Sequence, residues 1–273
     1  MNKPELKPYP GLRPFEQHES RIFFGREPQV DELLLRLKTH HFLAVLGASG
    51  SGKSSLVKAG LLPGLVVGYM GKVGTRWSIA EMRPGDQPFT HLAQGLLHDD
   101  LFQQARPDDE APFLAAELRR GPRSLHDILT ETPLPQGTRL LLLVDQFEEL
   151  FRFSEQHGDK TSETAAFVAL LLEASRHPDV YIVITMRSDF LGNTAEFHGL
   201  PEAINNGLYL TPRLTREQLH DAICLPAQLF GGTVDETLAN HLLNEAGSDP
   251  DQLPLLQHAL MRLWDKNEGE NNK

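Results

Sequence analysis

The sequence predicts an α/β fold in which helices flank a parallel β-sheet, followed by a small domain made only of helices. Three observations lead to this prediction. Apolar runs without polar alternation occur at 42–46, 140–144 and 180–185, as expected for strands that are covered on both faces. A glycine-rich loop separates the first run from a helical segment. After Pro212 the patterns are helical only, which predicts a core at 1–212 and a helical lid domain at 213–273.

Composition restricts the partners that the chain can have. The 273 residues suffice for one sizeable core and a smaller one. With 37 acidic and 26 basic residues the net charge is −11, which argues against a nucleic acid as partner of the surface as a whole. The longest apolar runs fall well short of the ~20 residues that span a bilayer, and residues 1–10 show no signal-peptide pattern. We therefore expect a cytoplasmic protein without a membrane partner.

The elements of the core follow in order along the chain. Prolines disfavour helix at 9–14, so we expect an extended segment there. Apolar spacing predicts a helix at 28–38, and the first strand follows at 42–46. The helix after the glycine-rich loop is expected at 54–62, ending at Pro63. The remaining predictions are a strand near 77–80, helices broken by prolines up to 135, and strands at 140–144, 180–185 and 208–210.

Capping signals define the helices of the predicted lid domain. Thr215 with Gln218 forms a capping box at the start of the first helix. Thr233 with Glu236 has the same spacing and predicts a second helix start, with Gly247 as its end. Pro254 suits the first turn of a third helix. The single cysteine, Cys224, lies in an apolar run and is expected in the core rather than at a reactive site.

The glycine-rich loop has the spacing of a P-loop, with Gly47, Gly52, Lys53 and Ser54 at the pattern positions, between a strand and a helix. Glycines allow consecutive N–H groups to turn toward phosphate oxygens at a helix N-terminus. Lys53 would bridge the β- and γ-phosphates, and the Ser54 hydroxyl would bind Mg²⁺. The expected ligand is ATP or ADP. The nucleotide-binding residues predicted here are Gly47, Ala48, Ser49, Gly50, Ser51, Gly52, Lys53, Ser54 and Ser55.

An aspartate follows the second apolar strand, at the place of a Walker B carboxylate. Asp145 comes directly after the run 140–144, where a carboxylate can hold the hydration shell of Mg²⁺. Glu148 and Glu149 lie within one turn of it, and either can orient the attacking water. The alternative is a solvated helix start, because acidic residues favour first turns.

An arginine follows the third apolar strand. The carboxyl ends of parallel strands open onto the same crevice, so Arg187 can reach the γ-phosphate that distinguishes ATP from ADP. The alternative is a surface arginine paired with Asp189.

The chain resembles the STAND class of signal-transduction ATPases, and most closely the novel STAND NTPases. The resemblance covers nearly the whole chain and is carried by five segments. These are 9–15 with 23–27, the P-loop, 144–151, 185–191 and 253–260. The resemblance implies that Phe24, Gly25 and Arg26 frame the adenine. It also implies that Arg187 senses phosphate and that Pro254 packs on the base, although Gln252 stands where related modules have a glycine.

These predictions favour a nucleotide-operated switch that hydrolyses ATP slowly, closes its helical domain, and reports its state through oligomerisation in signalling or bacterial defence. Expected partners are the nucleotide, further copies of the chain, or separate sensor and effector proteins. Family members usually continue into further domains, so we expect either a fragment or a stand-alone module. The rivals are an ordinary turnover ATPase and a scaffold that binds nucleotide without hydrolysing it.

Overall fold

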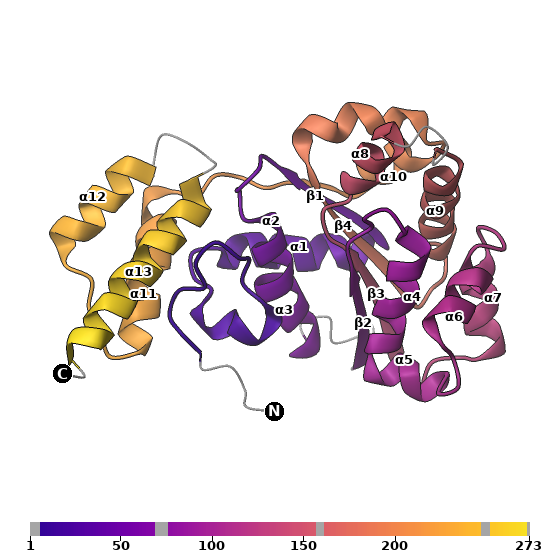
Figure 1. The fold of residues 1–273 in the computed structure, drawn as a ribbon, viewed down its shortest axis with the longest axis horizontal. Helices are drawn as coiled ribbons and strands as arrows, with labels where there is room; N and C mark the ends of the chain where they lie inside the picture. Colours follow the sequence, from indigo (N-terminus) through magenta and orange to yellow (C-terminus); the bar gives the residue numbers. More distant parts are fainter. Residues whose placement is uncertain (1–5, 69–75, 157–160, 247–251, 272–273) are drawn as a thin grey trace. The chain divides into compact units, whose positions relative to one another are not determined.

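The computed structural model describes residues 6–68, 76–156, 161–246 and 252–271 (Figure 1). The strands are β1 (Phe42–Gly47), β2 (Arg76–Met82), β3 (Thr138–Val144), β4 (Val180–Arg187) and β5 (Leu208–Leu210). The α-helices are α1 (Glu27–Thr39), α2 (Lys53–Ser55), α3 (Leu62–Val66), α4 (Pro88–His98), α5 (Asp100–Ala105), α6 (Ala111–Leu118), α7 (Ser124–Glu131), α8 (Glu149–Gln156), α9 (Thr161–Ala174), α10 (Leu200–Asn206), α11 (Arg216–Leu229), α12 (Glu236–Ala246) and α13 (Leu253–Asn271). Other helical turns are η1 (Gln17–Ile22), η2 (Leu56–Leu61) and η3 (Ser188–Glu196).

The sheet confirms the five strands predicted from the sequence. Its order is β2-β3-β4-β1-β5, and the pairs β2–β3, β3–β4 and β1–β5 are parallel. All six residues of β1 are buried, and β3 and β4 are buried at all but one position each. Continuous burial is what the unbroken apolar runs predict, because helices cover a parallel sheet on both faces. The fold class predicted from the sequence is therefore confirmed.

The parallel arrangement brings the carboxyl ends of the strands to one edge of the sheet. β1 leads directly into the glycine-rich loop, β3 leads into Asp145, and Arg187 is the last residue of β4. The segments that carry the predicted chemistry thus all begin at strand ends, where parallel α/β sheets bind their ligands.

The chain divides into two compact units, each described by itself. The sheet unit comprises residues 34–46 and 65–210, and the P-loop unit comprises residues 1–33, 47–64 and 211–273. The core of the sheet unit joins alternate residues of the strands to the apolar faces of α4, α6, α7, α9 and α10. The boundary between independent domains that the sequence predicts near Pro212 stays a prediction.

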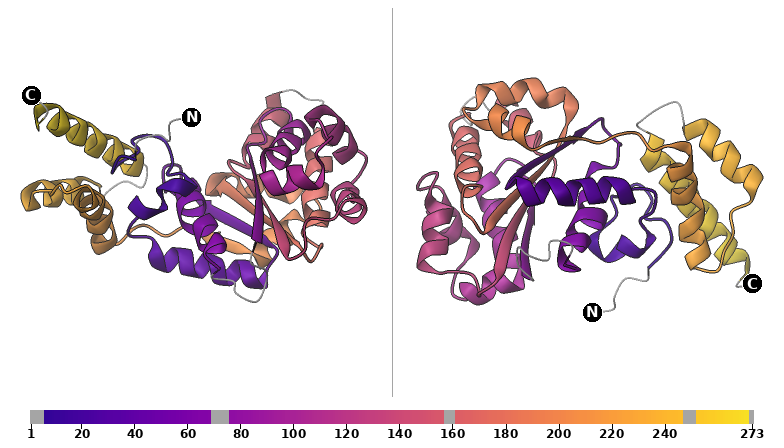
Figure 2. Two further views of the ribbon diagram at one scale, coloured as in Figure 1. Left: turned by 90° about the horizontal axis from the view of Figure 1, so that it is seen from below. Right: turned by 180° about the vertical axis from the view of Figure 1, so that it is seen from behind.

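The P-loop unit contains three segments that are far apart in the sequence. Helices α11, α12 and α13 pack together, and Figure 2 shows them as one group. Tyr9 of the N-terminal segment joins their core, where its hydroxyl donates a hydrogen bond to Ile223 O at 2.6 Å. Burial raises the pKa of the Tyr9 phenol, so this donor keeps its proton. Cys224 lies in the same core, as predicted.

The helix after the glycine-rich loop differs from the prediction. It does not end at Pro63, because a π-helical stretch over η2 is followed by the short helix α3. The N–H of Leu62 donates to Val57 O, which closes the widened turn. Pro63 then lies at the second position of α3, and the first turn of a helix tolerates a residue without an N–H.

Capping in the helical segment is confirmed at one predicted box and wrong at the other. Thr215 Oγ1 accepts from Gln218 N–H and the Gln218 side chain accepts from Thr215 N–H. The second helix instead starts after Asp235, whose carboxylate accepts from the N–H groups of Thr237 and Leu238. Asp235 provides a charged acceptor directly before the helix, so Thr233 is not needed as a cap. The predicted end at Gly247 lies outside the described residues.

No helix within the described ranges has both the length and the apolarity that a bilayer crossing requires.

Candidate nucleotide-binding site

The glycine-rich loop adopts a conformation that depends on its glycines. Gly50 and Gly52 have φ values of 66° and 85°, in the left-handed region that side chains avoid. Gly47 has ordinary φ, but a Cβ there would lie 2.7 Å from Ser51 Oγ. These three positions therefore need glycine for two reasons, backbone conformation and close approach.

Two polar side chains of this loop point to an anionic ligand. The Lys53 ammonium is buried and donates to Gly47 O at 3.0 Å and to Ala48 O at 2.6 Å. The Lys53 side chain therefore folds back over the loop in which a phosphate would bind. Ser51 Oγ is buried without a hydrogen-bond partner among the described residues. A buried hydroxyl without a partner is costly, and a ligand oxygen would satisfy it. These residues fit a phosphate group.

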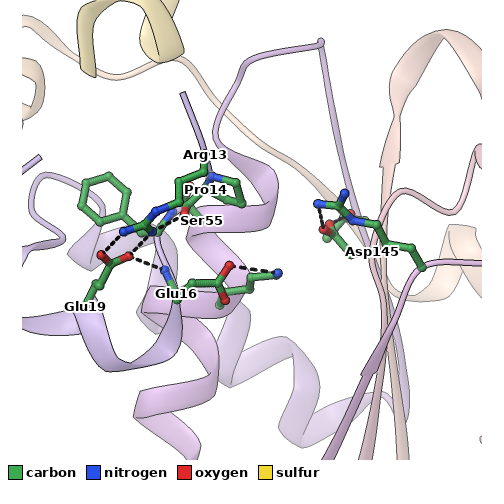
Figure 3. Close-up of polar contacts among 10 residues, drawn as sticks. Arg13, Pro14, Glu16, Glu19, Ser55 and Asp145 are labelled. Carbon is green, nitrogen blue, oxygen red and sulfur yellow. Dashed lines mark hydrogen bonds and ion pairs between the residues drawn. The ribbon is translucent and has the colours of Figure 1, made fainter. Parts of the chain in front are cut away.

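The two serines after Lys53 have different environments. Ser54 is half-buried in the short helix α2. Ser55 Oγ accepts a hydrogen bond from Phe15 N–H at 3.1 Å, so it holds the N-terminal segment against the helix that follows the loop. Figure 3 shows Ser55 beside Pro14. The predicted contact of Ser55 with nucleotide stays a prediction.

Arg26 connects the glycine-rich loop to the segment that precedes α11. Its guanidinium is 4% exposed and donates to Ser51 O at 3.1 Å and to Pro212 O at 2.7 Å. Gly25, with a φ of 81°, lies so close to α11 that a Cβ would meet Gln218 O. The pair Gly25–Arg26 therefore joins the P-loop to α11. Phe24, which the resemblance also places beside the adenine, is half-buried.

The start of α13 lies beside the P-loop. Leu253 Cδ1 lies 3.9 Å from the position that a Gly52 Cβ would take, and Pro254 follows it in the first turn. The sequence prediction of a helix that begins at Pro254 is thus accurate to one residue. Its contact with the base stays a prediction.

A buried carboxylate fixes the N-terminal segment. Glu19 is 3% exposed and receives two hydrogen bonds from the Arg13 guanidinium, at 2.6 and 2.7 Å, and one from Glu16 N–H at 2.8 Å. Figure 3 shows Arg13 and Glu19 pointing toward one another. Burial alone would raise the pKa of the Glu19 carboxyl, but these hydrogen bonds outweigh it, so the pKa lies below its ordinary value.

We expect the Glu19→Gln variant to lose stability at neutral pH and to lose less of it in acid. A carboxyl with a lowered pKa in the folded state contributes stability above its unfolded pKa of about 4.3, and this contribution is lost as the pH falls through the folded value. The hydrogen bonds to charged groups suggest a loss of about 1–3 kcal/mol at pH 7. Urea unfolding of both proteins at pH 7 and pH 3.5 measures the difference. Glu217→Gln, at an exposed position, is the control. An equal difference at both pH values would contradict the prediction.

The second group of predicted residues lies in the sheet unit, around Asp145. This carboxylate is 0% exposed, and its Oδ1 accepts from Thr185 Oγ1 at 2.6 Å. Thr185 Oγ1 in turn accepts from Gln146 N–H at 3.0 Å. Gln146 has a φ of 58°, which is uncommon for a residue other than glycine and marks a tight turn at the end of β3. The turn and Thr185 together fix the direction of the Asp145 carboxylate.

The two glutamates contact different strands. Glu148 is 7% exposed and its Oε2 accepts from Arg187 N–H, at the end of β4, at 3.3 Å. Glu149 begins α8 and its Oε2 accepts from Gly85 N–H, in the turn after β2, at 3.0 Å. Both glutamates follow Asp145 within four residues. The choice between them as the residue that orients water stays open.

Arg187 adopts the geometry that the alternative interpretation gives it. Its Nε and Nη2 donate to Asp189 at 3.1 and 2.5 Å, and its guanidinium carbon lies 5.5 Å from the Phe190 ring centroid. The side chain is 40% exposed. The role in reading the γ-phosphate stays a prediction, and in this conformation Asp189 occupies two of the donors of the guanidinium.

Two residues of this group were not assigned from the sequence. Thr185 ends a predicted strand and begins the segment 185–191, but neither pattern gives it a role, and no motif of the sequence includes Arg83. Arg83 Nη2 lies 3.5 Å from Asp145 Oδ2. The signal for Arg83 in the sequence is local: a charged residue, a proline and a glycine at 83–85, shortly after the strand predicted near 77–80.

Comparisons with known proteins decide the family. A family model described as Novel STAND NTPase 1 matches residues 8–273. The chain belongs to the Novel STAND NTPase 1 family. The resemblance inferred from the sequence is thereby confirmed. No curated protein sequence matches this STAND NTPase.

Solved structures similar to this STAND NTPase are P-loop ATPases. The Aeropyrum pernix ORC2 protein, solved as ADPNP–ADP complexes, has a TM-score of 0.58 at 15% identity, covering 98% of this chain and 67% of that one. A Walker-type ATPase of Pyrococcus abyssi has a TM-score of 0.55 at 17% identity, covering 92% and 71%. A chain of the HORMA:CdnC:Trip13 complex of E. coli MS115-1 has a TM-score of 0.51 at 14% identity, covering 88% and 80%. At these identities the similarity shows the fold alone.

Proposed function

We propose that this STAND NTPase is a nucleotide switch that binds ATP or ADP with Mg²⁺ at its P-loop, hydrolyses ATP slowly and self-associates in the ATP state. The observation that carries the proposal is the position of Arg26, whose guanidinium donates both to Ser51 O in the P-loop and to Pro212 O before the lid helices. A single buried side chain therefore connects the loop, where the ligand would change, to the segment that would move.

The binding half of the proposal rests on the loop itself. Lys53 supplies a cation, and the Ser51 hydroxyl, which has no partner in the part of the chain that the structure describes, supplies a donor for phosphate oxygens. The similar Aeropyrum pernix ORC2 protein was solved as ADPNP–ADP complexes, which supports adenine nucleotides as the ligand. Leu253 and Pro254, which begin α13 beside Gly52, suit the base in either nucleotide state.

The residues after β3 suit the hydrolytic half. Mg²⁺ prefers oxygen ligands and is usually bound by one or two protein side chains together with substrate phosphates. The buried Asp145 carboxylate and the Ser54 hydroxyl are donors of that kind. The cation would supply charge neutralisation at the β- and γ-phosphates. Thr185 keeps Asp145 oriented through its 2.6 Å hydrogen bond. Glu148 or Glu149 would accept a proton from the attacking water.

Slow turnover fits the environment of these glutamates better than fast turnover does. The Glu148 carboxylate accepts a hydrogen bond from Arg187 N–H and the Glu149 carboxylate accepts one from Gly85 N–H. Each contact occupies acceptor capacity that a general base would offer to water. A switch needs long-lived ATP and ADP states, whereas a motor needs rapid exchange between them.

We expect the ATP-bound protein to form larger assemblies than the ADP-bound protein, with hydrolysis far below the rate of a motor. Replacing the water-orienting glutamate should slow hydrolysis by about a hundredfold or more, since positioned bases contribute on this scale. The same variant should retain ATP and stay assembled. Light scattering with ATP and with ADP, and a multiple-turnover phosphate-release assay, measure both properties in the parent, Glu148→Gln and Glu149→Gln. Glu202→Gln, an exposed glutamate of α10, is the control.

The outcomes separate the proposed switch from its rivals. Equal mass in both nucleotides with fast hydrolysis identifies a turnover ATPase. Equal mass with bound nucleotide and no phosphate release identifies a scaffold. Equal hydrolysis by the parent and both glutamine variants would exclude Glu148 and Glu149 as the residues that orient water.

A further inference from the structure

The turn after β2 lies against the buried carboxylate that follows β3. Met82 pairs in register with Val144, which aligns Arg83 with Asp145 where the two strands end. The Asp145 N–H donates to Met82 O at 2.9 Å and extends the ladder by one residue. From this position the Arg83 Nη2 reaches to 3.5 Å from Asp145 Oδ2. Strand register therefore brings a cation to the candidate metal-binding carboxylate.

The backbone of this turn is held in place by its neighbours. Gly85 has a φ of 53° and donates from its N–H to Glu149 Oε2 at 3.0 Å. His91 Nδ1 lies 2.9 Å from Pro84 O. A Cβ at Gly85 would lie 2.9 Å from the His91 ring, so the turn packs closely on α4. With the backbone fixed, the part of the turn that is able to move is the long side chain of Arg83.

Burial of the two charged groups is very unequal. The Asp145 side chain is 0% exposed and the Arg83 side chain is 49% exposed. A buried carboxylate is costly unless it is both hydrogen-bonded and neutralised. Thr185 provides a hydrogen bond without charge, whereas Arg83 provides a full positive charge from the solvent side. An ion pair with one exposed partner contributes little free energy, so a cation of higher charge can displace it.

We propose that Arg83 is a positioning residue, a resident counter-cation that neutralises Asp145 and competes with a divalent cation for this carboxylate. The inference rests on the proposed function, in which Asp145 takes part in Mg²⁺ binding. When no divalent cation is present, Arg83 keeps the buried carboxylate compensated and oriented. When the cation arrives with nucleotide, the guanidinium leaves Asp145 and returns to solvent, a movement for which its half-exposed position leaves room. Arg83 therefore lowers the affinity of the site for the divalent cation.

The test measures the affinity for Mn²⁺, from the electron paramagnetic resonance signal of the free ion, with the full chain saturated with ADP. We expect Arg83→Gln to bind Mn²⁺ about two- to fivefold more tightly than the parent, the range for a half-exposed ion pair. Arg83→Lys keeps the charge and should stay within about twofold of the parent. The difference between the parent and Arg83→Gln should shrink at about 0.5 M KCl, because salt screens exposed charges. Arg76→Gln, at the opposite end of β2 and exposed, is the matched control.

The possible results separate this inference from the proposed function. An affinity of Arg83→Gln equal to or weaker than that of the parent, while the parent binds Mn²⁺, overturns the role of Arg83 and leaves the proposed function standing. Failure of the parent to take up Mn²⁺ with ADP, or an unchanged affinity in Asp145→Asn, overturns the metal role of Asp145 and with it both proposals. Arg83→Ala gives the same comparison if Arg83→Gln does not fold.

Discussion

Lys53→Ala is expected to abolish the stabilisation that ATP or ADP gives to this protein. Lys53 is the buried cation of the P-loop, and its ammonium lies over the carbonyl groups of Gly47 and Ala48. A ligand at about 100 times its dissociation constant adds roughly 2.7 kcal/mol to the free energy of unfolding. For a chain of this size that corresponds to a rise of roughly 5–10 °C in Tm. Differential scanning fluorimetry with and without Mg-ATP measures this rise in the parent and in the variant.

The control for this experiment is Lys38→Ala. Lys38 is an exposed lysine in the last turn of α1, so its removal changes the net charge equally without touching the loop. We expect it to retain the full shift. The Lys53 variant should also be compared without nucleotide, because loss of its two hydrogen bonds to the loop changes the ligand-free Tm. A full shift with Mg-ATP in Lys53→Ala would place the nucleotide at another site.

Arg187→Ala is expected to bring the affinities for ATP and ADP closer together by tenfold or more. Only the γ-phosphate distinguishes the two nucleotides, and a guanidinium can donate two charge-assisted hydrogen bonds to it. Such bonds contribute roughly 1.5–3 kcal/mol each before desolvation, and 1.4 kcal/mol corresponds to a factor of ten. Since Arg187 pairs with Asp189 in this structure, part of that gain is offset by the loss of the pair. Calorimetric titration of both nucleotides into the parent and the variant measures the ratio.

Two further variants sharpen this experiment. Asp189→Asn removes the competing carboxylate, so it should raise the preference for ATP over ADP. Pro254→Ala should instead weaken both nucleotides about equally, because a contact with the base is independent of the number of phosphates. An unchanged ratio of the two affinities in Arg187→Ala would remove phosphate sensing from this residue. The switch would then need another device to distinguish its states.

The strands and the P-loop could be predicted from the sequence because their signals are local. Each buried strand contains an unbroken apolar run, and the loop contains the glycines at 50 and 52 whose left-handed backbone makes the turn possible. The helix start at Thr215 was found for the same reason, since both partners of its capping box lie within four residues. The start after Asp235 could not be predicted in this way, because two possible acceptors, Thr233 and Asp235, lie close together there. The capping-box pattern does not show which of them accepts the hydrogen bonds.

The surroundings of Asp145 could not be predicted in the same way. Arg83 is 62 residues away from it in the sequence and Thr185 is 40 residues away. Their contacts depend on the sheet order β2-β3-β4 and on the register of each pair. A sequence pattern shows that a strand exists, but it does not show its neighbours. The ion pair of Arg187, by contrast, could be predicted from the sequence, because Asp189 is only two residues away.

The division of the chain has a consequence for how the protein is made. The P-loop unit is assembled from residues 1–33, 47–64 and 211–273, and the sheet unit supplies most of the residues between them. During synthesis the P-loop emerges early, but Tyr9 and Arg26 cannot reach Ile223 O and Pro212 O until residues 212–223 have left the ribosome. Contacts between such distant segments close large loops and form slowly. The sheet unit can complete its own strand order first, because β5 ends at Leu210. Nascent chains therefore pass through a stage with a finished sheet and an unfinished P-loop unit, so the contacts of Tyr9 and Arg26 form only after residues 212–223 have been made.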